Sequence, residues 1–454
     1  MYLADSRRSP ASDAAPVRRP GRLRGVAGTV LVLGIVSLLT DVSSEMVTAV
    51  LPLYLVTTVG LSPLGFGVLD AVYNGSAALM RLLGGFLGDR GGGRYKVVAV
   101  IGYALSALCK PVLACVHTLT LLGAVLAVDR TGKGLRTAPR DALISAATSP
   151  ERRGRAFGVH RAMDTVGALA GPVLAYLILR VAVDGYHAVF VVSSCVAAFG
   201  VLVLVLFVPR DPRPASADVG ASEVGTGPPQ ATSGPDGVRA LPARRRLRRL
   251  TVCAALLGLA TVGDSFVYLL LQHRYRLSAE WFPLLPIGTA AVFLLLAAPL
   301  GAVADRIGRW RMFLLGHLAL LGAYVLLLRS GADGGWFAGA APVVVLALHG
   351  LYYAATDGVL PAAAASAAPA GNCGASLALV GTGQAIGRFV CSLTLGALWT
   401  RWGDRAALSL MAAALVGALV VACHVLRGAE PPAAQGTCPP VAASPTRPTD
   451  EEPG

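Results

Sequence analysis

The residues Gly85-Phe86-Leu87-Gly88-Asp89-Arg90-Gly91-Gly92-Gly93-Arg94 form a short charged hinge between two hydrophobic runs. A second copy lies 216 residues further along (305 − 89 = 216) and reads Gly301-Ala302-Val303-Ala304-Asp305-Arg306-Ile307-Gly308-Arg309. It also stands between hydrophobic runs. A repeat of this kind predicts a membrane protein built from two matched halves, an arrangement that places a cavity at their interface near the midplane of the bilayer.

The composition indicates a membrane protein independently of the repeat. Hydrophobic residues make up 55% of the 454 residues and charged residues only 14%, whereas soluble domains carry about 25% charged residues. The mean hydropathy is +0.64. The net charge of +14 comes from arginines between hydrophobic runs, which indicates membrane topology rather than binding to nucleic acid. The eight cysteines lack C-x-x-C spacing, so we expect buried thiols, with no metal site or cofactor.

The hydrophobic runs predict twelve membrane spans, since roughly twenty residues cross the hydrocarbon layer. We expect a disordered N-terminus, a first six-helix bundle, a linker rich in Pro, Gly, Ser and Ala, a second six-helix bundle and a disordered tail, at residues 1–25, 26–209, 210–248, 249–427 and 428–454. Arginine and lysine are concentrated on alternate loops. This asymmetry predicts a multi-pass protein of the plasma (inner) membrane with both termini in the cytoplasm, and we expect a monomer.

The hinge pattern G-x-L-x-D-R-x-G-R, between the second and third spans, resembles the signature of the major facilitator superfamily, whose secondary transporters carry it in both halves. The resemblance implies an all-α fold of twelve transmembrane helices in two pseudo-symmetric six-helix bundles. It assigns the gate between conformations to Gly85, Asp89, Arg90 and Arg94, with Asp305 and Arg306 as the weaker copy. Gly93 stands where the family often has a further basic residue. The alternative is a loop of turn residues that follows the positive-inside rule.

Two carboxylates on the first span are candidates for proton coupling. Asp41 and Glu45 lie four residues apart, so both stand on one face of a helix. In an apolar cavity two close carboxylates do not both ionise easily, and such a pair can carry a proton. In the alternative interpretation, Asp41 caps or kinks its helix while Glu45 pairs with a fixed cation.

The fourth span carries a charged stripe. Asp129, Lys133, Arg136 and Arg140 recur at helical spacing, so the stripe must face a cavity or a partner helix rather than lipid. The pattern Leu126-x-x-x-Arg130-x-x-Lys133-Gly134 resembles the L-x-x-x-R-x-x-Q-G motif of proton-coupled members of the superfamily. The resemblance implicates Arg130 in proton transfer, although Lys133 replaces the usual glutamine.

The fifth span adds an acidic residue and a motif of small residues. Arg161 and Asp164 could pair with each other or with Arg140 and Asp141 on the fourth span, and such a network would take part in gating. Asp164 is also a candidate for proton coupling. The pattern Gly167-x-x-x-Gly171-Pro172 resembles the G-x-x-x-G-P of the antiporter signature, which adds Gly171 and Pro172 to the gate, although Ala175-Tyr176 replaces the glycine pair that normally follows.

The substrate cavity is expected between the halves. Its candidate residues from both halves are Lys110, Lys133, Arg136, His349, Tyr353, Gln384 and Arg388. His349, Tyr352, Tyr353 and Asp357 recur at helical spacing on the tenth span. The alternative for His349 is a satisfied donor between two helices.

Together these features predict a proton-coupled secondary transporter of a small organic solute, with protons, that solute and the lipid bilayer as its partners. Export by antiport is favoured by the Gly-Pro motif and the Arg130 motif. Uptake of an acidic or zwitterionic metabolite by symport is the alternative, because the lysines and arginines could make the cavity cationic. The sequence has no H-E-x-x-H, G-x-S-x-G or P-loop motif, so we do not expect an enzyme. A sensor that binds without flux is the remaining possibility.

Overall fold

The computed structural model describes residues 28–90, 95–148, 153–208, 237–329, 337–367 and 373–426. Within these ranges the chain forms helices joined by short turns, and no strand is present. The predicted N-terminal segment 1–25, the C-terminal tail 428–454 and most of the linker lie outside the described residues.

The first half contains six helices, as the hydrophobic runs predict. They are α1 (Gly28–Thr57), α2 (Pro63–Arg90), α3 (Tyr95–Cys115), α4 (Leu119–Ala146), α5 (Arg153–Val181) and α6 (Gly185–Phe207). Between α1 and α2 the chain turns at Gly60, which has a φ of 73°, a backbone conformation that glycine adopts without a steric penalty.

The second half is more broken. Its elements are α7 (Gly237–Gly258), α8 (Asp264–Tyr275), the 3₁₀ helix η2 (Ala279–Leu284), α9 (Leu285–Ile307), α10 (Arg309–Arg329), α11 (Phe337–Thr356), α12 (Val359–Ala367) and α13 (Cys373–Leu426). Helix α7 begins at Gly237, inside the stretch 210–248 expected to be a disordered connector. The expectation is wrong from 237 onward, because the Ala, Leu and Arg residues there favour a helix.

Eight helices in the described part of the chain are long and apolar enough to cross a membrane. The last one, α13, bends at Gly403, where φ is 81°, so that two helices are joined there. The all-helical, multi-span architecture is therefore confirmed, whereas the count of twelve spans stays a prediction.

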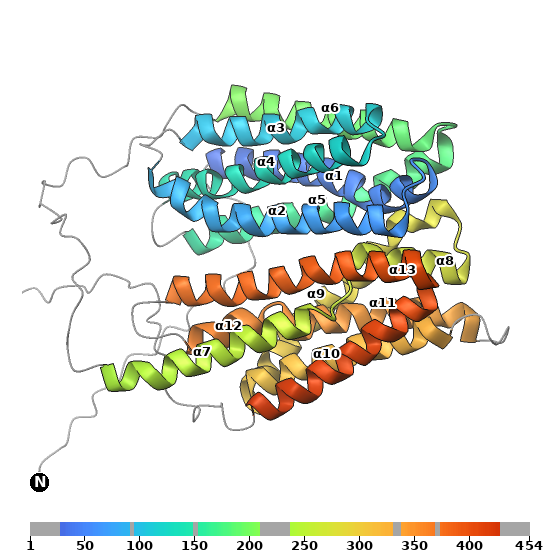
Figure 1. Ribbon diagram of the computed structural model, residues 1–454. Helices are drawn as coiled ribbons and strands as arrows, with labels where there is room; N and C mark the ends of the chain where they lie inside the picture. Colours follow the sequence, from blue (N-terminus) through green and yellow to red (C-terminus); the bar gives the residue numbers. More distant parts are fainter. Residues whose placement is uncertain are drawn as a thin grey trace, which may run out of the picture.

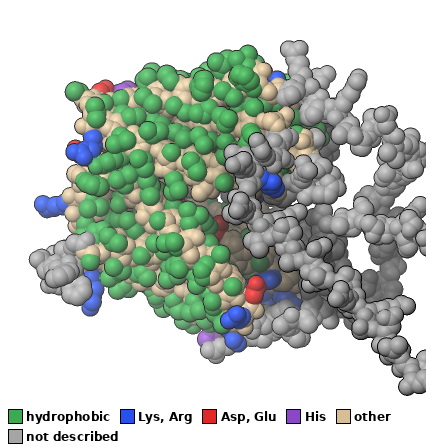
Figure 2. Space-filling view, turned by 180° about the vertical axis from the view of Figure 1, so that it is seen from behind, with side chains coloured by type: hydrophobic (Ala, Val, Ile, Leu, Met, Phe, Trp, Pro, Cys, Tyr) green, Lys and Arg blue, Asp and Glu red, His purple; other side chains and the backbone are tan. Residues whose placement is uncertain are grey.

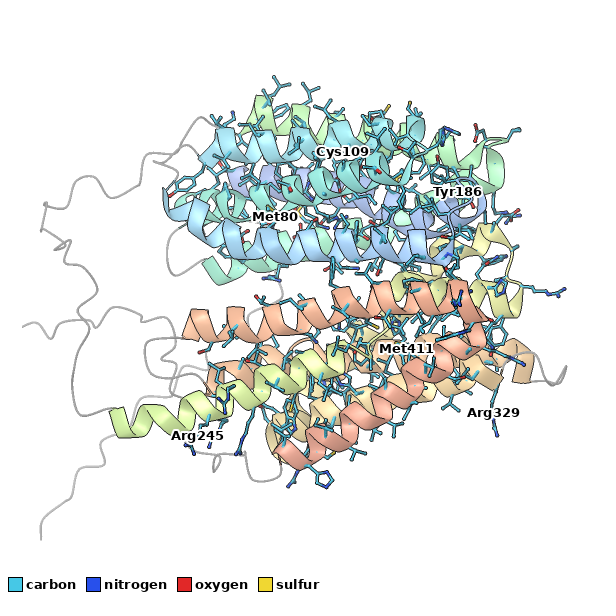
Figure 3. All side chains as sticks on the ribbon, viewed as in Figure 1. Met80, Cys109, Tyr186, Arg245, Arg329 and Met411 are labelled. Carbon is cyan, nitrogen blue, oxygen red and sulfur yellow. The ribbon has the colours of Figure 1, made fainter. Side chains whose placement is uncertain are left out.

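The two halves lie side by side, the first in blue to green and the second in yellow to red (Figure 1). The linker end of the molecule holds the start of α1, the end of α6 and the start of α7. The opposite loop end holds the turns at 58–62 and 182–184 and the bend at Gly403. Arg245 and Arg329 project from these two ends of the second half (Figure 3).

Hydrophobic side chains cover most of the outer face, while charged side chains gather at its borders and near a hollow between the halves (Figure 2). Ile101, Leu108, Phe199 and Leu295 are among the exposed hydrophobic residues of the described helices. A surface of this kind matches lipid, because a soluble protein rarely exposes so large a contiguous apolar area.

Contacts that join the two halves gather at the loop end. Helix α2 crosses α13 so closely that a methyl group on Gly396 would lie 2.6 Å from the carbonyl oxygen of Pro63. In the same region the Leu64 amide donates to the Thr400 hydroxyl at 2.9 Å. The rings of Tyr176 and Trp281 also meet there, with centroids 5.3 Å apart. The loop end is therefore the closed side of the molecule.

Candidate functional site

A ladder of polar contacts joins α1 and α4 at the depth of the membrane. Lys133 Nζ lies 3.7 Å from Glu45 Oε1. One turn further along, Arg136 Nη2 lies 3.5 Å from Asp41 Oδ1. At the next step Arg140 donates to the Ser37 hydroxyl at 3.1 Å. The carboxylates on α1 and the cations on α4 therefore neutralise one another in successive pairs.

Sequence spacing explains the ladder. Residues 37, 41 and 45 recur every four positions on α1, and residues 133, 136 and 140 recur every three or four positions on α4. Each set forms a stripe along one face of its helix. The residue numbers of the contacts rise along α4 as they fall along α1. The two stripes therefore run antiparallel, and each residue of one stripe contacts a residue of the other.

The ladder differs from the pattern expected for Asp41 and Glu45. Each carboxylate lies near its own cation, which for Glu45 is the alternative interpretation, and the role of both carboxylates in proton coupling stays a prediction. The Glu45–Lys133 pair is the open part of the ladder, with side chains 29% and 36% exposed. Asp41 and Arg136 are more enclosed.

A second group surrounds Asp129 between α3 and α4. Its carboxylate accepts from the Ser106 hydroxyl at 2.5 Å and lies 3.4 Å from Arg130 and 4.0 Å from Lys110. The Arg130 guanidinium also lies 3.7 Å from the centre of the Tyr73 ring on α2, a favourable cation–π distance. Arg130 is therefore fixed by two neighbours, one of them on another helix.

Two residues expected to line the cavity are buried within the first half instead. Lys110 is 3% exposed and donates to the Ser106 carbonyl at 3.2 Å. Arg136 is 4% exposed and lies over the Tyr103 ring at 4.5 Å. Acidic and aromatic partners on neighbouring helices enclose both cations. Lys133 is the exposed member, and a role of Lys110 and Arg136 in a substrate cavity stays a prediction.

A third group lies near the linker end of α4 and α5. Arg140 is 3.7 Å from Asp164 and 3.1 Å from Asp141, while His160 is 3.6 Å from Asp164. Arg161 is exposed, and no ion pair is recorded for it among the described residues. Of the predicted pairings, those of Arg140 with Asp141 and with Asp164 are present. Arg161 lies outside this network, because it stands on another face of α5.

The second half holds a smaller polar cluster. Tyr353 donates a hydrogen bond to Asp264, and His349 Nε2 lies 3.6 Å from the same carboxylate. His349 is buried. Arg388 donates to the Tyr352 hydroxyl at 2.7 Å, and its guanidinium lies 5.9 Å from the centre of the Tyr353 ring. The cluster brings together α8, α11 and α13.

Gln384 stands one turn before Arg388 on α13, and its side chain is partly buried. The backbone carbonyl oxygen of Gln384 would lie 2.8 Å from a methyl group added to Gly258. Helices α13 and α7 are therefore in close contact at this point. Asp357 is exposed and does not join the cluster. Within the described ranges no three His, Cys, Asp or Glu side chains come together as metal ligands.

The two copies of the hinge are described to different extents. The backbone of α2 runs through Gly85, Asp89 and Arg90, whose side-chain positions lie outside the described part of the structure, as does Arg94. The expected contacts of the first gate therefore stay a prediction.

In the second copy of the hinge, Asp305 pairs with Arg309 at 3.2 Å. Arg309 also donates to the Ala362 carbonyl on α12 at 2.9 Å. Arg306 is exposed, and no ion pair is recorded for it in the described ranges. Arg309, the first residue of α10, therefore links α10 to α12, and the gating role expected for Asp305 and Arg306 stays a prediction.

Gly171 and Pro172 lie where α5 crosses α1. A methyl group on Gly171 would lie 2.7 Å from the Val42 carbonyl oxygen and 2.9 Å from Glu45 Cβ. Only a residue without a side chain fits such a crossing. The G-x-x-x-G-P motif thus positions the helix that carries Glu45, and its role in gating stays a prediction.

Three residues at the polar clusters are not among the site residues predicted from the sequence. Asp264 accepts from Tyr353, Tyr73 packs on Arg130, and Asp70 accepts from Ser392 across the two halves. The available signal was the rarity of acidic residues in membrane spans, which applies to Asp70 and Asp264. Nothing in the sequence marks Tyr73.

Comparisons with known proteins agree with this arrangement. The sequence model of the Major Facilitator Superfamily matches residues 33–392. The chain belongs to the Major Facilitator Superfamily. It is thus a member of a family of membrane transporters and a multi-pass membrane protein.

Two relatives of this superfamily member come from prokaryotes. An uncharacterized MFS-type transporter of Methanocaldococcus jannaschii is 29% identical over 302 residues, which cover 65% of this chain and 71% of the relative. An uncharacterized protein of Mycobacterium tuberculosis is 30% identical over 294 residues, 64% of this chain and 69% of the relative.

Solved transporters share the fold. The nucleoside transporter NupG superposes with a TM-score of 0.71 at 14% identity, over 88% of this chain and 99% of that one. A peptide transporter POT superposes with a TM-score of 0.69 at 17% identity, over 90% and 96%. At these identities the likeness shows the fold of the superfamily and leaves the solute open.

Proposed function

We propose that this superfamily member is a proton-coupled secondary transporter of a small organic solute that works by alternating access and exports by antiport. The observation that carries the proposal is the Glu45–Lys133 ion pair, the exposed step of the ladder between α1 and α4. Charged side chains at membrane depth are tolerated where they pair with each other or face water. This pair does both, which suits a group that exchanges protons and contacts solute.

Protonation of Glu45 gives the pair two states. At 3.7 Å the two charges attract each other, although the distance exceeds that of a normal hydrogen bond. A proton on Glu45 removes its charge and leaves Lys133 without a counter-ion. A solute that contacts Lys133 or Glu45 then competes with the proton for the same pair. Competition of this kind supports antiport.

The charge balance favours export over uptake of an acidic solute. Lys133, Arg136 and Arg140 face Glu45, Asp41 and Asp164, so the wall of the first half has little surplus positive charge. Across from it, Arg388 and the tyrosines of α11 supply hydrogen-bond donors. These groups suit a neutral or amphiphilic solute. Symport of an acidic or zwitterionic metabolite remains the second outcome of the test below.

We place the linker end in the cytoplasm of a plasma membrane, with the protein acting as a monomer and binding no nucleic acid. Basic residues at the start of α7 support this orientation, because positively charged segments are retained on the cytoplasmic side. They are Arg245, Arg246, Arg248 and Arg249. In this orientation the closed loop end faces outward.

Everted membrane vesicles test the function and its direction. The lumen is acidified, acridine orange reports its pH, and compounds from a panel of amphiphilic drugs, nucleosides and small peptides are added one at a time. Export by antiport predicts that a solute added outside raises the lumen pH while it accumulates inside. Symport predicts that the solute leaves the lumen together with protons. If no compound exchanges with the proton gradient, proton coupling is contradicted.

Two variants test the assigned pair. Glu45→Gln and Asp41→Asn are expected to abolish proton-linked flux while the protein remains folded in detergent. Asp184→Asn is the matched control, since Asp184 is exposed at the loop end and pairs with His187 at 2.9 Å, away from the ladder. Unchanged flux in both ladder variants would remove these carboxylates from coupling.

A further inference from the structure

The span formed by α7 and α8 is broken in its middle. Helix α7 ends at Gly258, and α8 begins at Asp264 with Gly263 as its N-cap. The N-terminus of α8 therefore lies inside the protein, where its free amides and helix dipole present a partial positive charge. Broken helices in transporters use such ends to hold anionic groups.

Asp70 from the other half occupies this end of α8. It stands on α2, is 6% exposed, and its Oδ2 accepts from the Ser392 hydroxyl of α13 at 2.6 Å. The Ser265 side chain on α8 forms a further hydrogen bond with the carboxyl group. A methyl group on Gly263 would lie 3.1 Å from Asp70 Oδ2. The carboxyl group thus docks the first half against two helices of the second.

Asp70 differs in its partners from the acidic residues of the first-half clusters. Each carboxylate of the first-half clusters lies within 4.0 Å of an arginine or lysine. Among the described residues Asp70 forms no ion pair with an arginine or lysine, and its partners are the Ser392 and Ser265 hydroxyls and the Asn74 side chain. An ionised carboxylate buried without a cation is costly, whereas a protonated carboxyl group bonded to hydroxyls is not.

The surrounding charges favour the neutral form as well. The titratable or charged neighbours of Asp70 are Asp264 on α8 and Cys391 on α13. Tyr73 on α2 borders the same pocket, and Arg130 on α4 and Glu45 on α1 are neighbours of Tyr73. Asp264 is an acid and repels a second negative charge. Arg130 lies over the Tyr73 ring and is already paired with Asp129.

Space for water lies next to the carboxyl group. A pocket between α2, α1 and α8 is bordered by Asp70, Tyr73, Thr48 and Ser265 and by six hydrophobic residues. The hydroxyls of Thr48 and Tyr73 are 3.1 Å apart, and Thr48 stands one turn from Glu45 on α1. Two hydroxyl groups therefore lie between Asp70 and the ladder, in a pocket whose remaining lining is mostly apolar.

We propose that Asp70 is a proton-binding residue of the transport cycle, which closes the loop end when protonated and releases it when ionised. In the closed state the neutral carboxyl group bonds to Ser392 and Ser265. When the halves part at the loop end, water hydrates the group and it ionises. A proton taken up there is therefore required before α2 can dock again. The inference rests on the proposed proton coupling and assigns it a site separate from Glu45.

Spin labels on the two halves test this inference without solute or a proton gradient. In a background without the eight native cysteines, labels are attached at Val183→Cys and Trp402→Cys, two exposed positions at the loop end on opposite halves. Distances are measured by pulsed electron paramagnetic resonance in nanodiscs between acid and alkaline pH. The wild-type chain is expected to shift from short to long distances as the pH rises.

Asp70→Asn is expected to remain at the short distance at every pH, because the amide still bonds to hydroxyls and cannot ionise. The matched control Asp184→Asn keeps the wild-type pH dependence. A second variant, Ser392→Ala, keeps the carboxyl group but loses one bond of the closed state, so its transition shifts to lower pH. Wild-type pH dependence in Asp70→Asn, or distances in the wild type that ignore pH, would overturn the inference.

The two proposals fail separately. Flux in everted vesicles that ignores the proton gradient would remove proton coupling, whatever the spin labels report. Proton-driven flux together with an unaltered pH response in Asp70→Asn would retain the coupling and remove Asp70 from it.

Discussion

The hydroxyl of Tyr324 accepts a hydrogen bond from the Val262 amide at 2.7 Å. It also donates to the Ala260 carbonyl at 3.1 Å. Both backbone groups belong to the break between α7 and α8, where the helix supplies no partner for them. Backbone polar groups at membrane depth must be satisfied within the protein. A single side chain on α10 thus makes the broken span possible.

Tyr324→Phe is expected to lower the thermal midpoint of unfolding in detergent. The change leaves a buried amide and a buried carbonyl without their partner, at a cost of about 1–3 kcal/mol for each unsatisfied group. Differential scanning fluorimetry of the purified protein measures the shift. Tyr54→Phe is the matched control, since Tyr54 is also buried and its hydroxyl has no hydrogen-bond partner among the described residues. Equal midpoints for the two variants would contradict the bridging role.

Gly171→Ala is expected to destabilise the crossing of α1 and α5. The added methyl group would meet the Val42 carbonyl oxygen at 2.7 Å and the Met46 amide nitrogen at 2.9 Å, and backbone atoms cannot move aside as a flexible side chain can. Overpacking of this kind costs about 1–3 kcal/mol. Gly158→Ala on the same helix has no atom within 4 Å of the new methyl group and serves as the control. The idea fails if the two midpoints fall together.

The amino-acid sequence alone was sufficient to predict the class of fold. The repeated hinge and the long apolar runs predicted two matched helical halves, because membrane helices follow directly from the length and hydropathy of a segment. The break before Asp264 was not predicted. A window of twenty residues averages over such interruptions, and the hydroxyl that stabilises this one comes from Tyr324, 62 residues away.

The site was predicted less completely than the fold. The stripe of cations on α4 and the carboxylates on α1 could be found from helical spacing. Their pairing could not, because spacing within one helix says nothing about the register between two. For the same reason Lys110 and Arg136 were placed in the cavity, although their acidic partners on neighbouring helices enclose them.

Arg309→Ala is expected to slow the conformational cycle more than Asp305→Asn does. Asp305 and Arg309 form an exposed pair one turn apart, and such pairs contribute about 0.3–0.5 kcal/mol. Arg309 also bonds to the Ala362 carbonyl, a link between α10 and α12 that alanine removes. Rates of exchange between spin-label distances measure the cycle. Arg306→Ala, at an exposed position, is the control, and a larger effect there would return the gating role to Arg306.

A double-mutant cycle on Glu45 and Lys133 tests whether their ion pair is a functional unit. Glu45→Gln leaves Lys133 without its counter-ion, and Lys133→Gln leaves Glu45 without one, so each single variant is expected to lower the unfolding midpoint. The double variant removes both charges and is expected to recover most of the loss, because a charge within a membrane span that lacks its partner costs more than a missing pair.

Proton-linked flux should respond differently from stability. The double variant has no carboxylate at position 45, so its flux should remain lost even as its midpoint recovers. This split separates a structural ion pair, for which flux and stability recover together, from a pair that exchanges protons. Recovery of proton-driven flux in the double variant would show that Glu45 only neutralises Lys133, and the coupling role would then belong to another carboxyl group.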